Sequence, residues 1–176
     1  MNVDTYTRAA RSTALPTAYS FEYLAPGLVS EVGELYGVEA KTHRDGLTTA
    51  DNHAKMVGEW GDVAWVTALL RYHTGTLLAE RGTPVHTDPT PEDLGVDLDS
   101  YPLPTLMRIA LIVDGLAGRE ERLKDIYWLA METWYLLERF SGVMTGRSFD
   151  QVLQHNLDKL ASRKSRGVIG GSGDNR

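Results

Sequence analysis

The hydrophobic residues of this chain recur at intervals of three and four along most of its length, which is the spacing of amphipathic helices. No segment shows the strict alternation of apolar and polar residues that is typical of a half-buried strand. The pattern predicts helices over about 2–14, 27–43, 49–74, 103–117 and 119–141, and a last helix that begins after Ser148.

Helix-breaking residues predict where these helices end. Pro16 and the Pro26-Gly27 pair punctuate the N-terminal part, and Gly46 stands where a helix C-terminus is expected. The stretch 82–102 is rich in Pro, Gly and Asp and predicts a surface loop with one short turn near Thr90. Gly142 and Gly146 mark the next break, and we expect the Gly-rich tail 167–176 to be irregular.

The last helix is the best delimited one. Ser148 and Gln151 have the spacing of a capping box, in which each side chain bonds the backbone of the other residue. The residues that follow form an apolar stripe, namely Phe149, Val152, Leu153, Leu157 and Leu160. Together the elements predict one all-α domain over 1–176, a helical bundle with antiparallel neighbours.

Composition limits the classes of function. The net charge is −6 and the pI is about 5.3, which argues against binding a nucleic acid polymer. The absence of Cys excludes disulfides and Cys-based zinc sites and suits a reducing cytoplasm. No apolar run reaches the roughly 20 residues of a membrane span. We therefore expect a cytoplasmic protein that is not attached to a membrane.

Two pairs of acidic residues lie on apolar helix faces. Glu31 and Glu34 are three residues apart, and on a helical wheel Leu28, Leu35 and Val38 fall within roughly 60° of Glu31. The next helix repeats the arrangement with Glu59 and Asp62, which share a face with four apolar residues: Met56, Val63, Val66 and Leu70. Both helices therefore direct two carboxylates toward the protein interior.

A buried carboxylate must be paired, protonated or bound to a cation. Four converging acids with few cations nearby predict a divalent metal, and oxygen ligands favour Mg²⁺, Mn²⁺ or Ca²⁺ over zinc. A di-iron site would need Glu-x-x-His motifs, and none of the five His follows an acid at that spacing. Tilting of the acid pairs into water as ordinary surface charge is the alternative interpretation.

The residues around these acids resemble the MazG-like nucleotide pyrophosphohydrolases of the all-α NTP pyrophosphatase superfamily. The resemblance lies in Gly27-Leu28-Val29-Ser30-Glu31-Val32-Gly33-Glu34-Leu35, where Ser30 replaces the first Glu of the family's EExxE pattern, and in Glu59-Trp60-Gly61-Asp62. Further matches are Lys41 with Arg44-Asp45-Gly46, and Asn156-Leu157-Asp158-Lys159 with Arg163 and the Gly-rich tail. The segment about 75–147, which includes two extra helices, departs from the family as an insertion.

The resemblance implies a hydrolase that cleaves an NTP or dNTP between the α and β phosphates, giving NMP and pyrophosphate. Glu31, Glu34, Glu59 and Asp62 would bind Mg²⁺, for which Mn²⁺ can substitute, and Glu31 or Glu34 would activate water. Five residues would bind the substrate: Lys41, Arg44, Asn156, Lys159 and Arg163. The alternative for Lys159 and Arg163 is a solvated basic face near a helix C-terminus.

Several points stay open at the level of sequence. Trp60, Trp65, Tyr19 and Tyr23 are candidates for a wall against the nucleobase, although aromatic residues at helical spacing more often belong to a core. We expect a homodimer or a higher homo-oligomer, unless the inserted helices complete the bundle within one chain. A protein of the same fold that binds a nucleotide or an alarmone without hydrolysing it is the main alternative function. A structural protein whose acids form salt bridges is the third.

Overall fold

The computed structural model describes residues 1–83, 89–94 and 100–167, and every regular element among them is a helix. The elements are α1 (Val3–Arg11), η1 (Pro16–Ala18), α2 (Phe21–Asp45), α3 (Thr49–Glu80), α4 (Pro91–Leu94), α5 (Pro102–Leu116), η2 (Glu120–Arg122), α6 (Leu123–Thr145) and α7 (Phe149–Ser165). The expected all-α class is therefore confirmed for the described part of the chain. The tail from 168 onward lies outside the described residues.

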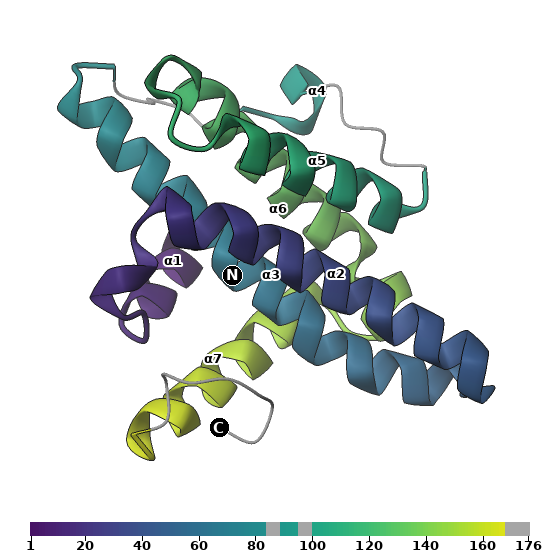
Figure 1. Cartoon of the computed structure of the whole chain (residues 1–176). Coiled ribbons are helices and arrows are strands. Elements are labelled where there is room, and N and C mark those ends of the chain that lie inside the picture. Colours follow the sequence, from purple (N-terminus) through teal and green to yellow (C-terminus); the bar gives the residue numbers. More distant parts are fainter. Residues whose placement is uncertain (84–88, 95–99, 168–176) are drawn as a thin grey trace.

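Helix α3 is the centre of the arrangement. It packs against α2 on one side and α6 on another, and α5 contacts both α2 and α6 to close a bundle (Figure 1). Helices α1 and α7 contact α3 and each other (Figure 1). The two helices expected within the inserted segment thus belong to the bundle itself, and α7 reaches α3 from outside it.

The hairpin between α2 and α3 follows from local signals in the sequence. Gly46 ends α2 with a φ of 63°, a left-handed conformation that side chains with a Cβ rarely adopt. Thr48 and Asp51 then form a capping box at the start of α3. Because the turn between the helices is so short, the middle of α2 lies against the first half of α3.

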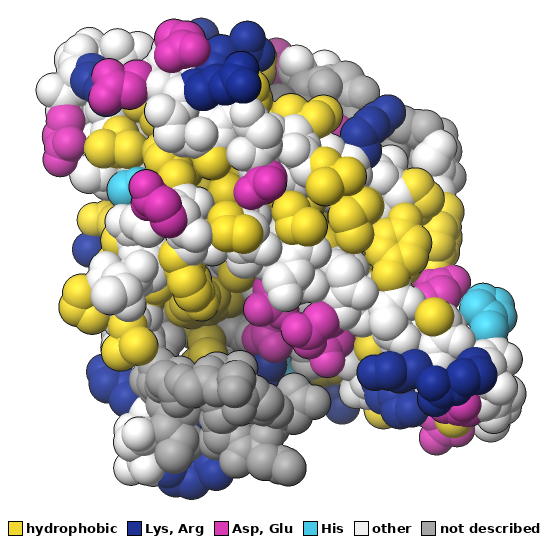
Figure 2. Space-filling view, viewed as in Figure 1, with side chains coloured by type: hydrophobic (Ala, Val, Ile, Leu, Met, Phe, Trp, Pro, Cys, Tyr) yellow, Lys and Arg dark blue, Asp and Glu magenta, His cyan; other side chains and the backbone are white. Residues whose placement is uncertain are grey.

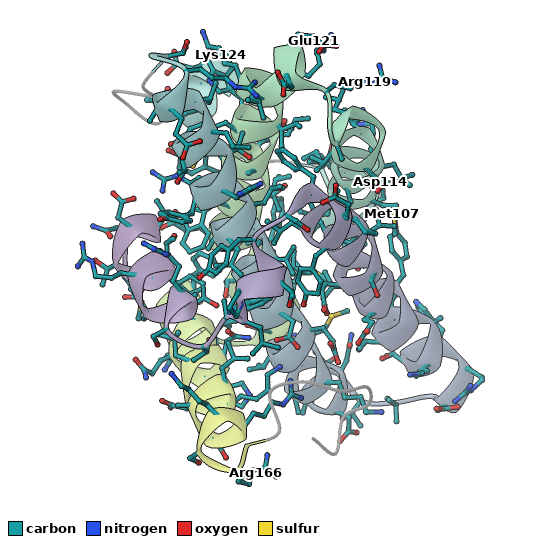
Figure 3. All side chains as sticks on the ribbon, turned by 60° about the vertical axis from the view of Figure 1, so that its left-hand side comes forward. Met107, Asp114, Arg119, Glu121, Lys124 and Arg166 are labelled. Carbon is teal, nitrogen blue, oxygen red and sulfur yellow. The ribbon has the colours of Figure 1, made fainter. Side chains whose placement is uncertain are left out.

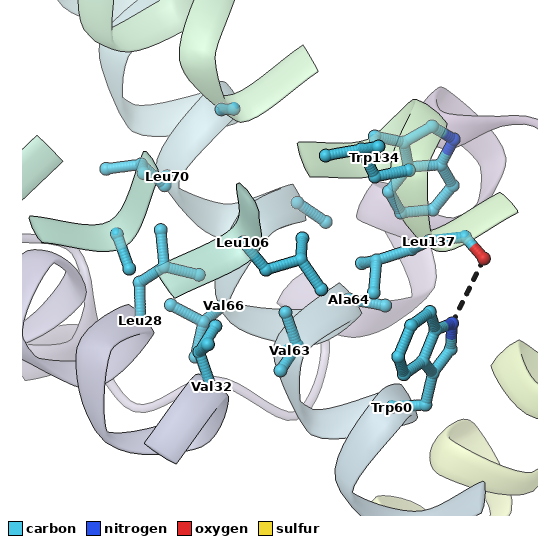
Figure 4. Close-up of a cluster of buried hydrophobic side chains, with 14 of the residues drawn as sticks. Leu28, Val32, Trp60, Val63, Ala64, Val66, Leu70, Leu106, Trp134 and Leu137 are labelled. Carbon is cyan, nitrogen blue, oxygen red and sulfur yellow. Dashed lines mark hydrogen bonds between the residues drawn. The ribbon is translucent and has the colours of Figure 1, made fainter. Parts of the chain in front are cut away.

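The core is apolar and lies between α2, α3, α5 and α6 (Figure 4). Leu28 and Val32 come from α2, and Leu106 comes from α5. Trp60 is fully buried, and its indole N–H donates to the carbonyl oxygen of Leu137 at 3.0 Å (Figure 4). The only large polar group of this side chain is therefore satisfied inside the bundle.

Several helix boundaries differ from those that the sequence predicts, including the end of α1, which lies at Arg11 and not near 14. Helix α2 begins at Phe21, not near Gly27, and continues through Pro26. Pro26 is exposed and lies close to the helix start, so its missing N–H costs one hydrogen bond, while the preceding residues Leu24 and Ala25 are buried in the core. The predicted break at Pro26-Gly27 is therefore wrong, because burial of the core face outweighs the local preference.

Helix α3 is longer than predicted, and α6 is displaced by four residues, from about 119–141 to Leu123–Thr145. Helix α3 continues from Thr74 to Glu80 because Leu78 packs in a second cluster with Leu123, Tyr127 and Met131 of α6. Helix α6 passes through Gly142 and ends at Gly146, whose φ is 66°. Within the described ranges, no helix is long and apolar enough to cross a membrane.

Candidate functional site

Three glutamates from the two long helices meet in one cluster. Glu31 and Glu34 of α2 and Glu59 of α3 each offer a carboxylate oxygen, and these three oxygens lie within 4.8 Å of one another. Glu31 and Glu59 are partly buried, and Glu34 is exposed. Figure 2 shows acidic side chains gathered on the face along which α2 and α3 run side by side, with Lys and Arg side chains on either side. The structure thus brings together three of the four predicted metal ligands.

The pKa values of two of these carboxyl groups are displaced toward neutrality. Burial, followed by the negative charges of Asp62, Glu34 and Glu59, raises the pKa of Glu31 to about 8. Burial, followed by the charges of Asp62 and Glu34, raises the pKa of Glu59 to about 7. The cluster therefore lacks enough positive charge to keep all its carboxylates ionised. A divalent cation would supply that charge.

Asp62 stands beside this cluster but is bound to α7. One of its carboxylate oxygens accepts from the side-chain amide of Asn156 at 2.8 Å, and the other accepts from the ammonium of Lys159 at 2.5 Å. Its charge still raises the pKa values of Glu31 and Glu59, and the charge of Lys159 lowers them. The predicted acids therefore divide into a cation-binding trio and a fourth acid that joins the trio to α7.

Asn156 lies at a close contact between α3 and α7. It is 1% exposed, and its side-chain oxygen accepts from the phenol of Tyr6 at 2.7 Å. A Cβ on Gly61 would lie 2.8 Å from the Cβ of Asn156, so only glycine lets α7 approach α3 this closely. Sequence reasoning did not single out Tyr6 or the packing role of Gly61. Tyr6 lies in no motif, whereas an isolated glycine within a helical pattern, as at Gly61, can indicate close packing.

The remaining predicted substrate-binding residues are not gathered at the cluster. Arg163 lies one turn beyond Lys159, partly buried, and forms no ion pair with any other described residue. Lys41 is exposed and, at seven residues from Glu34, lies about 10 Å further along α2 on the same face. Arg44 is exposed at the end of α2 and donates to Asp45 at 2.6 and 2.8 Å. Of the predicted cations, only Lys159 contacts an acid of the site.

The structure separates the aromatic candidates. Trp60 is a core residue, so it is not available to a nucleobase. Trp65 lies one turn after Asp62 and is partly buried, and its indole nitrogen is buried with no hydrogen-bond partner among the described residues. Tyr19 packs edge-on against Tyr72, and Tyr23 is 46% exposed. Among the four aromatic candidates, Trp65 is therefore the one that lies close in sequence to Asp62 and has an indole N–H without a hydrogen-bond partner among the described residues.

Comparisons with known proteins give one partial similarity to report. The chain is similar to the gene 37 protein of Mycobacterium phage L5, with 39% identity over 69 residues that cover 36% of this chain. These residues cover 54% of that protein, so the match spans about half its length. No protein family model matches the chain, and no solved structure matches it.

Proposed function

We propose that the protein is a Mg²⁺-dependent nucleoside triphosphate pyrophosphohydrolase of the MazG-like type. The observation that carries the proposal is the trio of Glu31, Glu34 and Glu59, whose carboxylate oxygens lie within 4.8 Å of one another. Helix α7 brings Lys159 to Asp62 beside this trio. The reaction adds water across the bond between the α and β phosphates, so that an NTP or dNTP gives NMP and pyrophosphate.

The residues of the trio fit a hard divalent cation. All the donors are carboxylate oxygens, which Mg²⁺ and Mn²⁺ prefer, and the raised pKa values of Glu31 and Glu59 indicate a deficit of positive charge. When bound, Mg²⁺ neutralises phosphate charge and lowers the pKa of a bound water. Glu31, Glu34 and Glu59 would hold the ion.

The protein's own residues supply the other requirements of the reaction. One carboxylate of the cluster, that of Glu31 or Glu34, would accept a proton from the attacking water. Lys159 and Arg163 share a face of α7 and would bind the phosphates of the leaving pyrophosphate. Lys41 and Arg44 would contact the substrate only from the exposed end of α2.

The alternative interpretation, in which the acids only form salt bridges, is less well supported than a cation site. Of the four acids, Asp62 is the one that forms an ion pair with another described residue. Glu31 and Glu59 are instead surrounded by acids, which is an unfavourable arrangement for a purely structural cluster.

The test is a panel of NTPs and dNTPs with Mg²⁺, in which the release of NMP and pyrophosphate is measured together. We expect turnover of at least one substrate and a loss of about 100-fold or more in Glu31→Gln and Glu34→Gln. Glu121→Gln is the matched control, because it removes the same charge from an exposed site. Figure 3 shows Glu121 at the end of the molecule opposite Arg166, which follows α7.

Two results would overturn the proposal. One is the absence of pyrophosphate release from every nucleotide, and the other is full activity in both glutamine variants. Tight nucleotide binding without turnover, measured by calorimetry, would instead favour a protein that sequesters or senses a nucleotide or an alarmone.

A further inference from the structure

A buried chain of hydrogen bonds runs from α1 through α7 to the acid of α3. The phenol of Tyr6 donates to the side-chain oxygen of Asn156 at 2.7 Å, and the amide nitrogen of Asn156 donates to Asp62 at 2.8 Å. Tyr6 is fully buried and Asn156 is 1% exposed. The chain of hydrogen bonds therefore ends at Asp62, beside the trio, and begins at Tyr6 on another helix.

The chemistry of the partners selects one orientation of the Asn156 amide. A carboxylate only accepts hydrogen bonds, so the amide nitrogen must face Asp62 and the amide oxygen must face Tyr6. The phenol then satisfies that oxygen by donating to it. Without the hydroxyl, the oxygen of Asn156 would be buried without this donor, which destabilises the orientation.

The backbone of α3 restricts Asn156 further. Because a Cβ at Gly61 would meet the Cβ of Asn156 at 2.8 Å, the asparagine side chain lies directly on the helix. Tyr6 itself is held against Trp134, with ring centroids 5.6 Å apart. The amide is thus fixed on one side by packing and on the other by the phenol.

We propose that Tyr6 is a positioning residue for the site: by fixing the Asn156 amide it holds one oxygen of Asp62 and so directs the other toward Lys159. The inference rests on the proposed function, because Asp62 is the acid that joins the cation-binding trio to Lys159 of α7. Asp62 and its partners lie outside the trio that would hold the ion, and removal of a hydrogen-bonded group from this outer layer typically lowers metal affinity or activity by 10- to 100-fold.

The experiment compares Tyr6→Phe with Thr74→Val in the full-length protein. Thr74 is also fully buried and its hydroxyl donates to the carbonyl of Leu70, so its removal costs a buried hydrogen bond on α3 away from Asn156. Two quantities are measured: the exchange rate of the Asn156 side-chain amide protons by NMR without metal, and the affinity for Mn²⁺ by calorimetry.

We expect Tyr6→Phe to accelerate exchange of the Asn156 amide and to weaken Mn²⁺ binding, each by about 10-fold or more. Thr74→Val should lower the melting temperature and leave both quantities unchanged. Wild-type values in Tyr6→Phe, or the same changes in Thr74→Val, would overturn the inference.

Two further measurements keep the inference separate from folding and from the proposed function. In the wild-type protein, the Tyr6 hydroxyl proton should be protected from exchange and should show a nuclear Overhauser contact to Asn156. The absence of this protection and of this contact would overturn the inference, even if Tyr6→Phe does not fold. If the wild-type protein hydrolyses no nucleotide but Tyr6→Phe changes amide exchange and Mn²⁺ affinity as expected, the proposed activity fails and the positioning role stands.

Discussion

Replacing Glu31 by Gln should stabilise the metal-free protein at alkaline pH and abolish its stabilisation by metal. Burial and three neighbouring acids raise the pKa of Glu31 from 4.5 to about 8. A carboxyl group with a raised pKa contributes full stability below 4.5, and this stability is lost as the pH rises toward 8. Glutamine remains neutral throughout, so the variant should not suffer this loss.

The size of the effect follows from the two pKa values. A group that titrates at 4.5 in the unfolded chain and at about 8 in the folded chain costs at most about 4 kcal/mol at pH 8. The same calculation gives a cost below about 1 kcal/mol at pH 5. Because water screens this partly exposed side chain, we expect Glu31→Gln to raise the free energy of unfolding by about 1–3 kcal/mol at pH 8.

The assay is urea denaturation followed by circular dichroism at pH 5 and pH 8, with a chelator and then with Mn²⁺. Saturation of a site at about 100 times its Kd should stabilise the wild-type protein by about 2.7 kcal/mol. Glu31→Gln should gain little from Mn²⁺, and Glu121→Gln should behave as the wild-type protein does under all conditions. Either of two results would refute the reasoning. One is a Glu31→Gln variant that is less stable than the wild-type protein at pH 8 with chelator, and the other is a variant that Mn²⁺ stabilises as much as it stabilises the wild-type protein.

Three other predictions concern the links between α3, α7 and the cluster. Asp62→Asn should lower the pKa values of Glu31 and Glu59, because the charge of Asp62 raises both. The measurement is carboxyl ¹³C titration by NMR, and unchanged pKa values would contradict the prediction. Ser148→Ala should cost about 1 kcal/mol of stability in urea denaturation by removing the α7 capping box, and a neutral result would mean that the cap does not contribute. Trp65→Phe removes an indole N–H that is buried without a partner, so it should leave the stability of the free protein within about 1 kcal/mol of wild type but weaken nucleotide binding measured by calorimetry. Equal nucleotide affinity would show that Trp65 does not contact the ligand.

The sequence by itself determined the all-α class of the fold and indicated the acidic residues from which the cluster is drawn. Helical periodicity and capping signals act within about four residues, so Gly46 and the Ser148–Gln151 box could be located without a structure. The spacing of Glu31 and Glu34 likewise fixed their common face, because three residues span nearly one helical turn.

Only the tertiary structure decided where helices continue and how the acids are partnered. Pro26 is a local helix breaker, yet α2 passes through it because its neighbours are buried in the core. Asp62 has the same local spacing as the other acids, but α7 supplies Asn156 and Lys159 to it from more than 90 residues away. Tyr6 and Asn156 are 150 residues apart, and no local rule relates them. Such contacts depend on how whole helices pack, and here that packing depends on the missing side chain of Gly61.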